Sequence, residues 1–188
     1  MRTFLPEDLS IKNWAQIETY FEDLNTRAID SVVDLKKWMQ DRSELEAVLE
    51  ENMAWRYIKM NIDTTDPELQ KSFQFFVQNI SPKIAPYEHG LNTKLINSKH
   101  LKDLDSAYYF IYLRDIKNAI HLYREENIPL FTELTNKAQK FGEISAQMTV
   151  QIDGKDQTLQ QASVHLKSID RDKRKAVFEL INSRRTED

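Results

Sequence analysis

The chain has 188 residues and a net charge of −4, so it is long enough for one sizeable hydrophobic core and gives no electrostatic reason to expect nucleic acid as a partner. It contains no cysteine, which excludes disulfides, thiolate catalysis and thiolate metal sites. Only three glycines occur, where average usage would give roughly a dozen, so few tight turns and a mainly α-helical fold are expected.

The N-terminal part shows helical periodicity from residue 13 onward. Asn13 can cap a helix with apolar side chains at helical spacing, namely Trp14, Ile17, Phe21, Leu24 and Ala28. Ser31 and Asp34 are spaced as in a variant of the capping box and predict a second helix, with Val32, Leu35, Trp38 and Met39 on one face. The pattern restarts at Ser43, which predicts a third helix with the apolar positions Leu45, Val48, Leu49, Trp55, Ile58 and Ile62.

The stretch DTTDPEL at 63–69 predicts a break followed by a new helix. Asp66 is suited to be its N-cap, and Pro67 is tolerated in the first helical turn. The apolar stripe of this helix consists of Leu69, Phe73, Phe76 and Ile80. Pro82 and Pro86 are expected to kink or restart it, because proline lacks the N–H that a helix needs, before it continues through Leu91, Leu95 and Ile96.

The segment 106–127 is predicted to be another helix. Its first turns, including AYYFIYL at 107–113, are apolar almost all round, so we expect it to be the most buried helix. This run is far shorter than the ~20 residues that span a bilayer. Pro129 is predicted to begin a further helix, whose apolar positions in phase are Leu130, Leu134, Ala138, Phe141, Ile144 and Met148.

The period changes from 3.6 to 2 at 148–159, where Val150 and Ile152 alternate before Asp153-Gly154. An Asp-Gly pair between alternating apolar residues predicts a β-hairpin. Thr158 and Gln161 fit a capping box for a short helix at 159–167. Asp170 is predicted to cap the last helix, with Val177, Phe178 and Ile181 buried. The predicted fold is therefore mainly α, with roughly eight helices and one β-hairpin near 148–159.

The segment IHLYREENIPLF at 120–131 raises the question of a metal or acid–base site. On a helix, His121 and Glu125 lie one turn apart and share a face. Catalytic zinc, however, needs three protein ligands, and the residue one turn upstream is the cation Lys117. We therefore predict an exposed ladder of alternating charge here instead of an active site.

No other residues form a recognisable catalytic motif. Glu88 and His89 would complete H-x-x-E-H only if residue 85 were histidine, and it is Ala85. His100 and His165 are expected in a polar turn and on a short helix. H-E-x-x-H, G-x-S-x-G and glycine-rich phosphate loops do not occur in the sequence. We predict no catalytic, cofactor-binding or metal-binding residues in this chain, and we expect the aromatic residues Tyr108, Tyr109, Phe110, Tyr112, Trp14, Trp38 and Trp55 to belong to the core.

Several segments resemble the N-terminal region of oligoendopeptidase F-type zinc metallopeptidases, the thimet-oligopeptidase-like group. They are 2–24, beginning RTFLPEDL, then 34–66, 75–92 and 127–182, and together they cover nearly the whole chain. The resemblance implies a helical N-terminal part that closes over a deep channel. In such enzymes a C-terminal part carries zinc on H-E-x-x-H and a further glutamate, and no position here matches those zinc ligands or the general base.

The resemblance thus implies that residues 1–188 are a single helical N-terminal domain, or fragment, of a larger peptidase, with possible sub-units at 1–100 and 101–188. The chain alone is expected to be inactive, and zinc is expected only in the full-length parent. Expected partners are the C-terminal catalytic half, peptide substrates in the parent, and a second copy through an uncovered apolar face, but neither nucleic acid nor membrane. The alternative is a free-standing helical protein-interaction module. The expected location is the cytoplasm, because the N-terminus lacks the apolar stretch of a secretory signal.

Overall fold

The computed structural model describes residues 2–63 and 65–187, which are mainly helical and carry one two-stranded antiparallel sheet. This confirms the predicted fold class. The chain forms two compact units, unit 1 (Met1–Leu134) and unit 2 (Thr135–Asp188), and the boundary lies within a helix, α6 (Asn127–Gln147). The predicted sub-units that meet near residue 100 stay a prediction. Along the described residues, no helix combines the length and the apolar composition that crossing a membrane requires.

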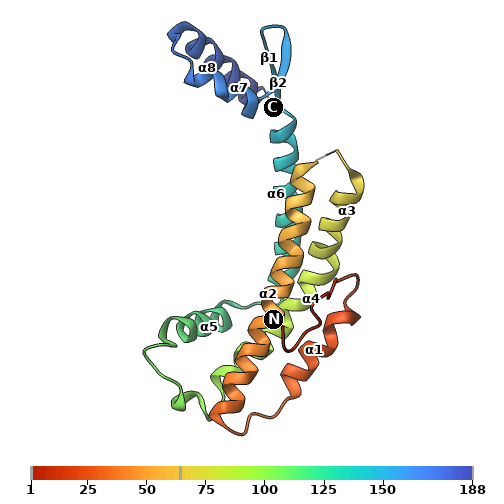
Figure 1. Cartoon of the computed structure of the whole chain (residues 1–188), viewed down its shortest axis with the longest axis vertical. Helices are drawn as coiled ribbons and strands as arrows, with labels where there is room; N and C mark the ends of the chain where they lie inside the picture. The colour runs from red at the N-terminus through yellow and green to blue at the C-terminus, as the bar shows by residue number, and fades with distance from the viewer. Residues whose placement is uncertain (1, 64, 188) are drawn as a thin grey trace. The chain divides into compact units, whose positions relative to one another are not determined.

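Unit 1 is built from helices that lie alongside one another (Figure 1). In chain order its elements before α6 are α1 (Ala15–Thr26), α2 (Val32–Ile62), α3 (Pro67–Phe75), a π-helix (Phe76–Ile80), α4 (Ser81–Ile96), a 3-10 helix (Leu101–Asp103) and α5 (Phe110–Leu122). Helix α1 packs on α2 and α4, α3 packs on α2, and α5 packs on α4. The main hydrophobic core lies among these helices.

Helix α1 begins where the sequence predicts, because the Asn13 side chain accepts a hydrogen bond from the backbone N–H of Gln16 at 3.2 Å. The Gln16 side chain accepts one from the backbone N–H of Asn13 in return. Its buried residues are Ile17, Phe21 and Leu24. The prediction that the stripe reaches Ala28 is wrong: the helix ends at Thr26 and Ala28 is exposed.

Helix α2 is one helix of 31 residues, so the prediction of two helices that meet at Ser43 is wrong. Ser31 caps it as predicted, with its side chain accepting from the N–H of Asp34. Ser43 is exposed within the helix, because α2 contains neither glycine nor proline and a buried stripe runs past it. The predicted apolar face does not continue to the end of the helix, because Trp55, Ile58 and Ile62 are all exposed.

Pro82 marks the restart of the helix after α3, as predicted, whereas Pro86 lies inside α4 and does not restart it. Phe73, Phe76 and Ile80 are buried on the predicted stripe, whereas Leu69 is only partly buried. The chain widens into a π-helix before Pro82, which lies in the first turn of α4. Proline donates no backbone hydrogen bond, so its ring is accommodated most easily where the regular helical bonding is already interrupted.

Helix α5 contradicts the prediction that it is the most buried helix. It covers Phe110–Leu122 instead of 106–127, and Ile116 is its one buried residue. Tyr108, Phe110 and Leu122 are 78%, 61% and 72% exposed. Among the described elements α5 packs chiefly on α4, so one face is covered and the apolar residues on its other faces are exposed.

The hairpin of unit 2 is formed by β1 (Thr149–Ile152) and β2 (Lys155–Thr158), with Val150 paired to Gln157. Asp153 and Gly154 make the turn, with φ values of 53° and 74°, as the prediction requires. The buried residues Val150 and Ile152 point into the core of this unit.

Two helices complete unit 2 after α6: α7 (Leu159–Ser163), which continues as a 3-10 helix (Val164–Lys167), and α8 (Arg171–Thr186). Both start signals are confirmed, because Thr158 forms a capping box with Gln161 and the Asp170 side chain caps α8. Val177 and Ile181 are buried as predicted. Phe178 is 59% exposed, so its predicted burial is wrong.

Candidate functional site

The structure does not bring the histidines of the sequence into a common site. Helix α5 ends at Leu122, so His121 and Glu125 do not share a helical face, and the predicted ladder with Lys117 is wrong. No group of three or more His, Asp or Glu side chains within 2–63 and 65–187 is placed to hold a metal ion.

Each remaining histidine makes a local contact. The His89 ring stacks on Tyr123, with centroids 4.1 Å apart, and joins α4 to the end of α5. His100 Nδ1 lies 3.3 Å from an Asp103 carboxylate oxygen, and His165 Nε2 lies 3.2 Å from the side-chain oxygen of Gln157. These contacts fix turns and helix ends, and none of them pairs a histidine with a nucleophile.

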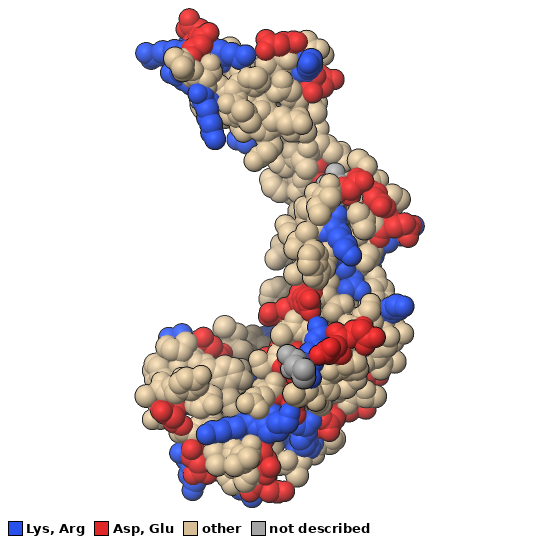
Figure 2. Space-filling model, viewed as in Figure 1, with Lys and Arg blue, Asp and Glu red and all other residues tan. Residues whose placement is uncertain are grey.

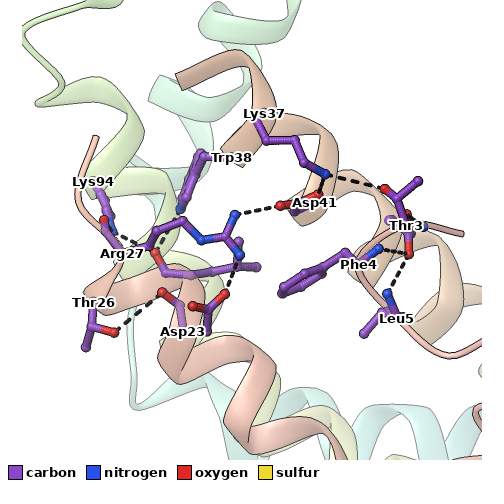
Figure 3. Close-up of polar contacts among 12 residues, drawn as sticks. Thr3, Phe4, Leu5, Asp23, Thr26, Arg27, Lys37, Trp38, Asp41 and Lys94 are labelled. Atoms are coloured by element: carbon purple, nitrogen blue, oxygen red, sulfur yellow. Dashed lines mark hydrogen bonds and ion pairs between the residues drawn. The ribbon is translucent and has the colours of Figure 1, made fainter. Parts of the chain in front are cut away.

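A polar network joins the end of α1 to α2 (Figure 3). Arg27 bridges Asp23 on α1 and Asp41 on α2, and Lys37 Nζ lies 2.5 Å from Asp41. The Arg27 pKa is raised: burial pushes it down, but the hydrogen bonds that Arg27 donates to Asp23 and Asp41, and the attraction to their charges, outweigh that effect. Because the Asp41 side chain is only 3% exposed, its two cationic partners are what makes burying its charge tolerable.

The same region ties α4 to α1 through one ammonium group (Figure 3). Lys94 Nζ donates to the backbone carbonyls of Leu24, Asn25 and Arg27 at 2.6–2.8 Å. Trp38 Nε1 donates to the Leu24 carbonyl at 2.8 Å as well. A cation at the carbonyl end of a helix is favourable, because the last carbonyls of a helix have no partner within it. The network therefore has a structural role.

Glu44 on α2 anchors the N-terminal segment in a similar way. Its carboxylate accepts hydrogen bonds from the backbone N–H groups of Thr3, Phe4 and Leu5 at 2.8, 2.9 and 2.7 Å. Burial pushes the Glu44 pKa upward, but these hydrogen bonds together outweigh it and lower the pKa. The segment is thereby held against α2, with Leu5 in the core.

The best candidate for a functional site is a cleft of about 490 Å³ between α2, α4 and α5, which we call the α2–α4–α5 cleft. Its floor is apolar and includes Leu49, Met53, Phe76, Ile84 and Ile116. Its polar residues are Arg42, Glu46 and Glu50 from α2, Ser81, Glu88 and Asn92 from α4, and Tyr112 from α5. An apolar pocket with a few convergent polar groups is the usual form of a ligand site.

Arg42 is the best-positioned polar residue of the cleft, and its side chain is only 5% exposed. Its Nε donates to Glu46 at 2.7 Å and its Nη2 donates to the side-chain oxygen of Asn92 at 2.6 Å. Among the described residues, Nη1 has no hydrogen-bond partner. Buried donors are nearly always paired, so this donor is a candidate for contact with a ligand.

Glu88 is the second unusual group of the cleft. It is partly buried, and burial raises its pKa, as does repulsion from Glu46 and Glu50, while Arg42 acts in the opposite direction. Burial also raises the pKa of the Tyr112 hydroxyl on the opposite helix. Clustered ionisable groups with shifted pKa values in a cleft are typical of functional sites.

The sequence does not single out these residues. Arg42 with Glu46, and Glu88 with Asn92, are pairs four residues apart on two separate helices. Such spacing is common on ordinary exposed helix faces. Only the packing of α2 against α4, which the periodicity does not specify, brings the two pairs into one cleft.

A second feature is the exposed apolar surface of α6, none of whose residues is buried. Leu130 and Leu134 in unit 1 are 59% and 62% exposed, and Phe141 in unit 2 is 73% exposed. Figure 2 shows Lys, Arg, Asp and Glu scattered over the visible face of the chain, with uncharged surface between them. Extended exposed apolar surface is typical of contact with another protein surface.

Comparison with known proteins gives a consistent family and fold. The family described as the Peptidase M3 N-terminal domain matches residues 4–123. A solved structure provisionally described as an oligoendopeptidase F matches with a TM-score of 0.83 and 19% identity, over 98% of this chain and 32% of that one. One with the same description from Bacillus anthracis str. Ames has a TM-score of 0.82 and 19% identity, over 100% and 35%. No match is found among curated proteins. The chain spans about a third of the length of these two structures, and they share its fold.

Proposed function

The chain belongs to the peptidase M3 family through the N-terminal domain that its residues 4–123 match, and from this premise we propose that it is the non-catalytic, cleft-forming N-terminal domain of a zinc metalloendopeptidase that hydrolyses short peptides. M3 peptidases are metallopeptidases. The similar structures are about three times as long as this chain, which supports a parent with a separate C-terminal catalytic part. We propose the cytoplasm as its location.

The structural observation that carries the proposal is the exposed apolar stripe of α6. A single fully buried Leu or Phe side chain contributes ~1.5–3 kcal/mol, so leaving Leu134 and Phe141 in water forgoes substantial stabilisation. A catalytic part that packs on this helix would recover that free energy. In this arrangement the N-terminal domain supplies one wall of a substrate channel and limits the length of peptides that enter.

The described residues do not fit a zinc site, because no three potential ligands converge among them. A tight zinc site needs three or four such ligands at about 2.0–2.3 Å. We therefore assign zinc to the catalytic part of the proposed parent and give this chain no chemical step. Its proposed work is to bind, orient and enclose the peptide.

The alternative is a free-standing helical interaction module, which the same α6 surface supports because it would suit any apolar partner. The two functions differ in one measurable respect. As a peptidase domain, the chain should be required for turnover by the separately produced C-terminal part of its parent. As a free-standing module, it should have no effect on peptide hydrolysis.

The test mixes the 188-residue chain with that C-terminal part, one equivalent of zinc and a quenched fluorescent peptide. Turnover should require both parts, and Leu134→Glu in α6 should abolish it by placing a charge in the contact. The matched control is Val33→Glu, at a residue of α2 that is 70% exposed and lies outside α6. Full activity of the C-terminal part alone would refute the proposed function.

A further inference from the structure

We propose that the α2–α4–α5 cleft binds the free amino terminus of a peptide, with the ammonium group against the carboxylates of Glu88 and Glu50 and the first carbonyl oxygen accepting a hydrogen bond from Arg42. The binding is a property of this chain alone. Its role as a substrate subsite rests on the function proposed above.

The first step of the argument is the unused donor of Arg42. Its guanidinium is buried and oriented by Glu46 and Asn92, at 2.7 and 2.6 Å, so its position in the cleft wall is fixed. Nη1 has no partner among the described residues. A buried guanidinium N–H forms its strongest hydrogen bonds with oxygen acceptors. The ligand should therefore bring an oxygen atom to this wall.

The second step is the charge of the cleft. Glu46, Glu50 and Glu88 line it together with one cation, Arg42, and no lysine is among its lining residues. Burial and repulsion between these carboxylates raise the pKa of Glu88. A cationic ligand would relieve this repulsion, whereas an anionic one would increase it. Glu46 already accepts from Arg42, which leaves Glu50 and Glu88 as the carboxylates for the ligand.

The third step is the combination of the two requirements. A peptide amino terminus carries an ammonium group and, three bonds from its nitrogen, a carbonyl oxygen. A lysine side chain has only the ammonium group, and a peptide carboxyl terminus has the wrong charge for the three glutamates. The apolar floor, including Leu49 and Ile84, suits an uncharged first side chain. A volume of about 490 Å³ falls within the range of ligand sites.

The site should have a characteristic pH dependence. The charged groups that face Glu88 are Arg42, Glu46 and Glu50 from α2, and Tyr112 lies across the cleft on α5. Because the pKa of Glu88 is raised, affinity should increase with pH as this carboxyl ionises. Affinity should then fall above about pH 8, where the α-ammonium group loses its proton. A bell-shaped profile is expected.

The experiment titrates the 188-residue chain with trialanine amide, its N-acetylated form, and Nα-acetyl-lysine amide, monitored by calorimetry and by amide NMR shifts. Trialanine amide should bind at least about tenfold more tightly than either acetylated probe, because only it carries an ammonium group and a carbonyl oxygen at the spacing of an amino terminus. Glu88→Gln should weaken its binding about tenfold and remove the acidic limb of the pH profile. Glu50→Gln provides a second variant within the cleft, and Glu125→Gln, at an exposed residue outside it, should change nothing.

Equal binding of the N-acetylated peptide, tighter binding of acetyl-lysine amide, or no binding of any probe would each overturn the inference. A Glu88→Gln variant that keeps both the affinity and the pH profile would also overturn it. The complementation assay separates this outcome from the proposed function. Turnover that requires both parts, without binding of trialanine amide, rejects the subsite and retains the peptidase domain. Selective binding without complementation retains the amino-terminus site and rejects the peptidase domain.

Discussion

Replacing Glu44 with glutamine tests how the N-terminal segment is held on α2. The carboxylate accepts three backbone hydrogen bonds, from Thr3, Phe4 and Leu5, at 2.7–2.9 Å. Hydrogen bonds to charged groups contribute ~1.5–3 kcal/mol and neutral ones ~0.5–1.5 kcal/mol, so neutralising the acceptor should cost about 1 kcal/mol per bond. Because Glu44 is only partly buried, we expect Glu44→Gln to lower the free energy of unfolding by about 1–2 kcal/mol in total.

The assay is urea unfolding followed by tryptophan fluorescence, which reports on unit 1 because all three tryptophans lie in it. The expected loss corresponds to a midpoint about 1 M lower in urea. The Glu44 pKa is lower in the folded chain, so its contribution to stability is present above the ordinary glutamate pKa and is lost as pH falls through the folded value. The difference between the two proteins should therefore shrink on acidification.

The control is Glu7→Gln, which changes an exposed glutamate in the same N-terminal segment and should leave the midpoint within experimental error. An unchanged midpoint for Glu44→Gln at neutral pH would refute the reasoning. So would a loss of stability that stays the same at acidic pH, because it would mean that packing and not the carboxylate charge holds the segment.

Three further predictions concern the hairpin, the cleft and metal binding. Gly154→Val should destabilise unit 2 by ~1 kcal/mol or more, seen as a lower thermal midpoint, because Gly154 has φ of 74°. Gly142→Ala in α6 should be neutral or stabilising, since the added Cβ meets no atom within 4 Å beyond its chain neighbours and the backbone of its own helix. Glu88→Gln should stabilise the chain at neutral pH. Because the Glu88 pKa is raised in the folded chain, the free energy of unfolding falls as pH rises from the ordinary glutamate pKa to the folded pKa, and glutamine avoids this loss. A urea midpoint that is unchanged at pH 7 would contradict this. Calorimetry should detect no tight zinc binding to the isolated chain, and zinc-dependent peptide turnover by this chain alone would contradict the assignment of zinc to another part of the parent.

Local features of the fold could be predicted because they depend on residues three or four apart. The caps at Ser31, Asp66, Thr158 and Asp170 all form as expected, each through a side chain that accepts from a nearby backbone N–H. Ser43 shows the limit of local signals, because a serine at which the apolar pattern restarts is compatible with the interior of a long helix. Whether the helix continues depends on the buried stripe of α2, which requires neighbours that the local sequence does not identify.

The candidate site could not be predicted for a related reason. Arg42 and Asn92 are fifty positions apart in the chain, yet their side chains are 2.6 Å apart. Periodicity gives the apolar face of each helix but not the angle or register at which α2 crosses α4. The unpaired donor of Arg42 and the raised pKa of Glu88 arise from that crossing, so neither has a signature in the sequence.

The apolar residues that are exposed on α5 and α6 point to a surface that another protein part covers. The apolar run before Tyr112 predicts a buried helix, and the apolar residues of α6 are in phase on one stripe, yet Leu134, Phe141 and Phe110 are more than half exposed. A helix with an apolar stripe gains most of its stability from the surface that covers the stripe. Under the proposed function, these apolar side chains are buried in the complete enzyme, where they contact its catalytic part. Under the alternative function, the same side chains would mark the surface of a different partner, and the Leu134→Glu variant would then disrupt that partnership while peptide turnover stayed unaffected.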